Sequence, residues 1–313
     1  MLNWLGGLLG ERRSRPRIEP ALSTRSVLPS ALSVSPEAPD PHAGFIEWLL
    51  DTGPTRDAAL DASERQALQR LDERLADGAP AAAELLTRVP AGIPQLLSAL
   101  RQEDLPVQAL SEQIGKDLLL TAEVLRLAAS VHYRPRDRPA ITDLSQAVTA
   151  LGRTGVQQAV ARVLLRPMFD VNAGPLTRLA ATRLWEHAER KAGSCAALAA
   201  SQGIEPFEGY LAGLAHNSGW SAAWRILDRD GLQLALPCTL GFAREMVWRR
   251  DRLFGALVSA WQITPALTAL GAEARHTALG RVNSPLGPLL LAADLAASEA
   301  LRGAALPAAA KVQ

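Results

Sequence analysis

The sequence predicts an all-α protein, and two observations lead to this prediction. From about residue 43 onward, apolar residues recur at intervals of three and four, which places them on one face of a helix. No stretch alternates apolar and polar residues between hairpin turns, as a half-buried strand would. We therefore expect a multi-helix bundle.

The first clear helix is predicted to begin at residues 63–66. Ser63 and Gln66 have the spacing of a capping box, in which the two side chains satisfy backbone N–H groups of the first turn. Apolar positions follow at helical spacing: Leu68, Leu71 and Leu75. Gly78 is expected to end the helix, because glycine readily adopts the left-handed conformation of a helix stop.

A longer helical face is predicted next. Its members are Val107, Leu110, Ile114, Leu118, Thr121, Leu125 and Ala128. Asp117 can restart the helix within this run as an N-cap. Leu144, Val148 and Leu151 form a further stripe closed by Gly152, and the one after it consists of Val156, Val160 and either Val163 or Leu164. The segment 172–175 (NAGP) is the strongest break, so we expect two helical halves.

Composition limits the class of protein. The chain has 313 residues, of which 48% are hydrophobic, and its 33 basic residues are balanced by 32 acidic ones. A core of useful size is therefore available, and the basic excess typical of a nucleic-acid binder is missing. Two cysteines cannot form a disulfide framework, which favours a reducing compartment. No apolar run is long enough for a transmembrane segment, so we expect a cytoplasmic protein.

The N-terminal region has a different composition. Residues 1–42 are rich in proline and serine, which predicts a disordered leader with too little apolar surface to fold. Within it, residues 2–17 combine a short apolar tip with four arginines. A frayed terminus is the simpler interpretation, and a membrane-peripheral adaptor is the alternative.

Several short motifs follow one another through the rest of the chain. In the first half they are residues 89–94 (VPAGIP), 110–117 (LSEQIGKD), 121–133 (TAEVLRLAASVHY) and 141–152 (ITDLSQAVTALG). In the second half they are residues 184–187 (LWEH), 210–220 (YLAGLAHNSGW) and 289–301 (LLLAADLAASEAL). Together they resemble the HDOD domain, a helical bacterial signalling module related to the HD phosphohydrolases. Ala129 departs from this pattern, which usually has asparagine there.

The resemblance implies a domain organisation. Residues 88–170 correspond to the N-terminal helical half of an HDOD domain, and residues 171–313 correspond to its HD-like half. Residues 43–87 are expected to form a helical extension that the resemblance does not cover. The implied fold is an HD-like bundle in two helical halves, preceded by the disordered leader.

The resemblance also implies a site. HD phosphohydrolases hold divalent metals with a histidine, a His-Asp pair and a distant aspartate, and the corresponding residues here are His187, His216, Asn217 and Asp294. The pair has become His-Asn, and a neutral amide is a poor ligand for a hard cation and cannot bridge two of them. Two imidazoles and one carboxylate remain for a vestigial or weak divalent metal site. The simpler interpretation is that the histidines are structural and that Asp294 hydrogen-bonds one of them.

Other candidate residues favour a structural role. Cys195 lies among alanines on an apolar helix, which is typical of a small buried residue and not of a nucleophile. Cys238 stands alone after Pro237. Trp220 and Trp224 are four residues apart, so they share one helical face and are expected in the core.

These features predict a non-catalytic, HDOD-type signal-transduction module that acts through protein partners or a weakly bound ligand. We expect no cofactor, no nucleic acid and no catalytic residue. The alternative is a metal-dependent phosphohydrolase or phosphodiesterase with a reduced HD site. The oligomeric state, the partner and the signal do not follow from the sequence.

Overall fold

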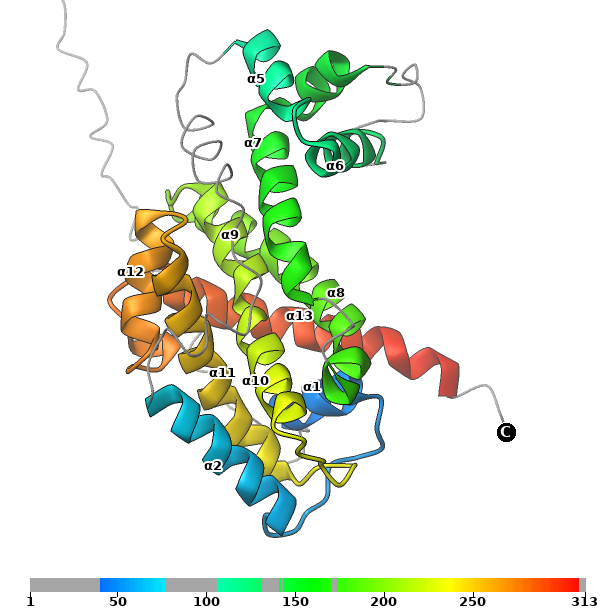
Figure 1. Cartoon of the computed structure of the whole chain (residues 1–313), viewed down its shortest axis with the longest axis vertical. Helices are drawn as coiled ribbons and strands as arrows, with labels where there is room; N and C mark the ends of the chain where they lie inside the picture. Colours follow the sequence, from blue (N-terminus) through cyan, green and yellow to red (C-terminus); the bar gives the residue numbers. More distant parts are fainter. Residues whose placement is uncertain (1–39, 77–105, 131–140, 142, 170–173, 310–313) are drawn as a thin grey trace, which may run out of the picture. The chain divides into compact units, whose positions relative to one another are not determined.

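The computed structural model describes residues 40–76, 106–130, 141, 143–169 and 174–309, most of which lie in helices (Figure 1). The first half contains α1 (Pro41–Leu50), α2 (Ala62–Ala76), α5 (Val107–Ile114), α6 (Leu118–Ala128), α7 (Leu144–Leu165) and the short 3₁₀ helix η1 (Arg166–Phe169). The second half contains α8 (Pro175–Ser201), α9 (Pro206–His216), α10 (Ser218–Arg229), α11 (Leu240–Trp261), α12 (Pro265–Ala274), η3 (Leu279–Arg281) and α13 (Leu286–Ala309). Within the described ranges no strand forms, and Arg56 and Thr239 make only an isolated bridge. The all-α prediction is confirmed.

The start of α2 differs from its prediction. The capping box is formed by Asp61 and Glu64: the Asp61 carboxylate accepts from the Glu64 N–H at 2.9 Å, and the Glu64 carboxylate accepts from the Asp61 N–H at 3.0 Å. Ser63 instead donates to Asp61 at 2.7 Å. Asp61 outcompetes Ser63 because an ionised oxygen makes the stronger bond to a backbone N–H. The predicted box at Ser63–Gln66 is therefore wrong by two residues.

The long predicted face between residues 107 and 128 is split into α5 and α6. Asp117 caps the second helix by accepting from the Leu120 N–H at 2.9 Å, as predicted. The restart rotates the buried face, so that Leu120 and Val124 are buried while Leu118 is 83% exposed. Gly152 likewise breaks α7 in the middle, with a φ of 61° that favours glycine.

The second half is built around α8, which packs against α9, α10 and α13, while α11 packs against α10 and α12. Close approach of α8 and α9 requires a glycine: a Cβ on Gly213 would lie 2.7 Å from the Ala192 Cα. This contact places the end of α9 beside the middle of α8. Trp220 and Trp224 are buried as predicted, with ring centroids 5.5 Å apart in a stacked arrangement.

Some predictions lie outside the described residues. They include the leader up to residue 39, with the apolar tip at residues 2–17, and the helix stop at Gly78. Within the part of the chain that the structure describes, no helix is both long and apolar enough to cross a membrane.

Candidate functional site

The four residues implied by the resemblance converge in the second half of the protein. His187 comes from α8, His216 and Asn217 from the junction of α9 and α10, and Asp294 from α13. The two histidines and the asparagine are 0% exposed, and Asp294 is 6% exposed. Residues more than a hundred positions apart thus form one buried cluster.

A lysine lies at the centre of this cluster. Lys191, one turn after His187 on α8, is 0% exposed. Its Nζ lies 2.9 Å from His216 Nδ1, 2.6 Å from Asn217 Oδ1 and 2.8 Å from Asp294 Oδ1. Three acceptors call for three N–H donors, which only the protonated amine supplies. Burial lowers the pKa of Lys191, and the Asp294 carboxylate opposes this shift.

An arginine and a second aspartate from α11 complete the cluster. Arg250 donates to Asp294 Oδ2 at 2.7 Å and to Asp251 Oδ1 at 2.8 Å. Asp251 Oδ1 also lies 2.9 Å from His216 Nε2. Burial alone would raise the pKa of Asp294, but the charges of Arg250 and Lys191 hold it well below its usual range. Two buried cations and two buried carboxylates therefore balance one another.

The two histidines are neutral members of this network. His216 Nδ1 accepts from Lys191, so its Nε2–H donates to Asp251. The Asn217 side-chain amide lies 3.1 Å from His187 Nδ1 and donates to the Leu184 carbonyl at 2.7 Å. Burial, followed by the charge of Lys191, lowers the pKa of His187 to about 3.

The predicted direct hydrogen bond between Asp294 and a histidine is not formed. The nearest histidine nitrogens, His216 Nδ1 and His187 Nε2, lie 3.6 and 3.9 Å from Asp294 Oδ1. Lys191 donates to Asp294 Oδ1 and Arg250 donates to Oδ2 instead. A charge-assisted hydrogen bond is stronger than one from a neutral imidazole. Ser298 Oγ, at 3.1 Å from His187 Nε2, is the remaining partner of that histidine.

The side chains do not fit a divalent metal in this arrangement. Three atoms that would be ligands, His216 Nδ1, Asn217 Oδ1 and Asp294 Oδ1, already bind one ammonium group. A divalent cation there would face the charges of both Lys191 and Arg250 at short range, with one carboxylate of the implied set to offset them. The ammonium group thus supplies the positive charge that a metal would supply.

Helix α1 covers one side of the cluster. The ring of Phe45 lies 4.6 Å from that of His187 and 5.6 Å from that of Trp220, measured between centroids. Trp48 lies 6.3 Å from His187. Because α1 also packs on α8, α11 and α13, it helps to keep water away from the charges.

Sequence reasoning missed Lys191, Arg250 and Asp251. The sequence did contain a signal that could have identified Lys191. This lysine follows His187 by four residues and shares a helical face with Ala188, Ala192 and Cys195, all of which are buried. A charged residue on such an apolar face predicts a buried partner. The interpretation of Cys195 as a small buried residue is confirmed. Its side chain is 1% exposed, and burial raises the pKa of its thiol to about 12.

Stability is expected to fall as the pH is lowered from 7 to 5. The pKa of His187 is lower in the folded chain than in the unfolded chain, so the unfolded chain takes up the proton first. The stabilisation is complete above pH 6.5 and is lost as the pH falls toward the folded value, by about 2 kcal/mol between pH 7 and 5. Burial lowers the pKa of His216 as well, which acts in the same direction.

Urea unfolding at pH 7, 6 and 5 measures this slope. His187→Gln is expected to reduce it, and His276→Gln, at an exposed residue, is the control for a histidine-to-glutamine substitution elsewhere in the chain. A free energy of unfolding that stays constant between pH 7 and 5 contradicts the prediction.

The helical order and the convergence of His187, His216 and Asp294 define an HD-type helical scaffold. The sequence matches the HDOD domain over residues 86–274. The chain therefore belongs to the HDOD domain family. None of the curated proteins matches it.

Solved structures support the same fold. An HDOD domain protein of unknown function from Geobacter sulfurreducens is similar at 22% identity and a TM-score of 0.54, over 75% of this chain and 78% of that one. A Shewanella amazonensis protein described as a "Putative metal-dependent phosphohydrolase" is similar at 17% identity and a TM-score of 0.51, over 78% of this chain and 99% of that one.

Proposed function

We propose that this protein is a non-catalytic HDOD module that serves in signal transduction through protein partners or a weakly bound ligand. One observation carries the proposal: Lys191 Nζ binds three of the atoms that would ligate a metal, at 2.6–2.9 Å. HD-type hydrolysis needs a metal ion that lowers the pKa of a water molecule. A lysine ammonium provides charge but no open coordination position for that water.

Two further features support the proposal. Asn217 replaces the aspartate of the His-Asp pair, and its amide is used to bond Leu184 and Lys191. Phe45 and Trp48 of α1 lie against His187, and α1 precedes the segment that matches the family. A substrate would therefore need α1 to move before it could reach the buried side chains.

The alternative is a metal-dependent phosphohydrolase that uses His187, His216 and Asp294. Its support is the description of the Shewanella amazonensis structure, which concerns that protein, and the convergence of the three residues. This alternative requires Lys191 to leave the cluster, and the ion pair with Asp294 at 2.8 Å opposes that movement.

Metal content separates the two functions. Protein purified without chelator, incubated with manganese, iron or zinc and then desalted, is expected to retain close to no metal per chain. It is also expected to leave bis(p-nitrophenyl) phosphate intact. A metal content near one per chain, with turnover that Asp294→Ala abolishes, would establish the phosphohydrolase instead.

A further inference from the structure

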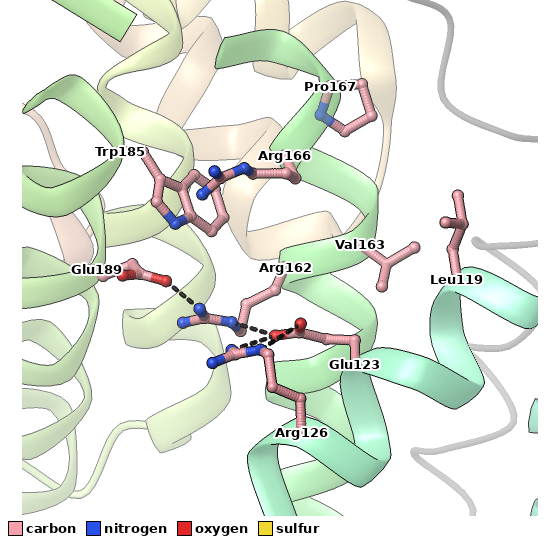
Figure 2. A pocket seen from close by; sticks show the side chains of 9 residues that line it. All are labelled: Leu119, Glu123, Arg126, Arg162, Val163, Arg166, Pro167, Trp185 and Glu189. Carbon is pink, nitrogen blue, oxygen red and sulfur yellow. Dashed lines mark hydrogen bonds and ion pairs between the residues drawn. The ribbon is translucent and has the colours of Figure 1, made fainter. Parts of the chain in front are cut away.

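A second site lies away from the lysine cluster, in a cavity between α6, α7 with η1, and α8 (Figure 2). Its volume is about 590 Å³, which falls within the range of small-molecule pockets, roughly 300–1,000 Å³. The polar part of its lining consists of Glu123, Arg126, Arg162, Arg166 and Glu189, beside Trp185. The site is thus rich in arginine and contains an aromatic ring.

Arg166 stacks on the indole ring of Trp185. Its guanidinium carbon lies 4.6 Å from the centroid of the Trp185 ring, and Trp185 itself is 7% exposed. Stacking orients the planar guanidinium group while its N–H groups stay free to bond. Among the described residues, no carboxylate pairs with Arg166, although the side chain is exposed along this cavity. Arg166 is therefore an oriented cation without a counter-ion there.

The other arginines are held by carboxylates. Glu123 accepts from Arg162 at 2.5 Å and forms two bonds with Arg126, at 2.7 and 2.8 Å. Glu189 pairs with the other side of Arg162, so Arg162 is clamped between two helices. Three arginines against two glutamates leave one positive charge in the cavity. This charge belongs to Arg166, and the side chain of Arg126, 55% exposed, adds unused donors.

The wall beside these charges is apolar. Val163, Pro167 and Leu119 line it, and Figure 2 shows Val163 and Leu119 on the side of the cavity away from Trp185. Leu119 is 72% exposed, so apolar surface is available to a bound molecule. A ligand that suits both parts of the cavity has an anionic group at Arg166 and an apolar body against Val163 and Leu119.

We propose that this cavity binds a small phosphate monoester with a flat or aliphatic body. Arginine binds a phosphate group through two parallel N–H bonds, which matches an oriented and unpaired guanidinium group. This site names the class of ligand for the proposed signalling function, and its biological role rests on that function. Binding itself does not involve the lysine cluster.

Isothermal titration of the full chain tests the proposal with four probes: adenosine monophosphate, octyl phosphate, inorganic phosphate and adenosine. At least one of the two monoesters is expected to bind saturably, and the better one reports whether the body is flat or aliphatic. Arg166→Gln is expected to weaken that binding at least tenfold, and Arg166→Lys to weaken it less. Arg190→Gln, at an arginine of α8 outside the cavity lining, is the control and keeps the wild-type affinity.

Three results would overturn the proposal: no saturable binding of either monoester at millimolar concentration, equal affinity of the wild type and Arg166→Gln for the monoester that binds, or, where that monoester is adenosine monophosphate, equally tight binding of adenosine. Its failure is separate from failure of the proposed function. Metal content and turnover report on the lysine cluster, and the difference in monoester affinity between the wild type and Arg166→Gln reports on this cavity.

Discussion

Replacing Lys191 by methionine is expected to lower the free energy of unfolding by about 3–5 kcal/mol, the usual cost of breaking a buried ion pair. Methionine fills a similar volume, so the loss arises from charge and hydrogen bonding. Asp294 loses one of its two cations, and three acceptors lose their donor. Urea unfolding at pH 7 measures the change, and Lys116→Met, at an exposed position, is the control, with an effect within about 0.5 kcal/mol.

A second substitution separates charge from packing. Lys191→Met combined with Asp294→Asn leaves Arg250 paired with Asp251 and restores a neutral cluster. We therefore expect the double variant to be more stable than the sum of the two single changes predicts. Additive losses, or a loss below about 1 kcal/mol for Lys191→Met, would mean that Lys191 is not balancing the buried carboxylates.

Combining Lys191→Ala with Asn217→Asp is expected to create a metal site. The first change removes the ammonium group from between His216 and Asp294, and the second restores the carboxylate of the His-Asp pair. Two imidazoles and two carboxylates then surround the vacated volume, a ligand set that suits zinc, iron or manganese. After incubation with metal and desalting, we expect about one metal ion per chain and a higher unfolding midpoint than without metal.

Asn217→Asp alone is the matched control for this experiment. It carries the same new carboxylate but keeps Lys191, so it is expected to remain free of metal. If it binds metal as well as the double variant does, the ammonium group is not what excludes the cation. Circular dichroism establishes that both variants are folded, so that an unfolded double variant is not mistaken for a negative result.

The helices could be predicted from the sequence because their causes are local. Repeats of leucine and valine at intervals of three and four define a helical face whatever lies opposite. Asp117 caps α6 through a backbone N–H three residues away, and Gly152 breaks α7 through its own backbone freedom. Where two local candidates compete, as Ser63 and Asp61 do at the start of α2, sequence spacing alone did not separate them.

The convergence of His187, His216 and Asp294 could be anticipated through resemblance, but the chemistry between them could not. Lys191 contacts partners 25, 26 and 103 residues away along the chain. Arg250 reaches Asp294 from a fourth helix, 44 residues distant. Whether a lysine on an apolar face turns outward or inward depends on what the neighbouring helices present to it.

The sequence by itself therefore determined the all-helical class, the start of α6 at Asp117, the break at Gly152 and, through the resemblance, the positions derived from an HD site. Only the tertiary structure decided what those positions hold. Periodicity and capping act within a few residues, whereas a buried charge is tolerated only where distant side chains pair with it. The packing of α8, α9, α11 and α13 brings two carboxylates to two cations, and so places Lys191 Nζ among the atoms that a metal would otherwise bind.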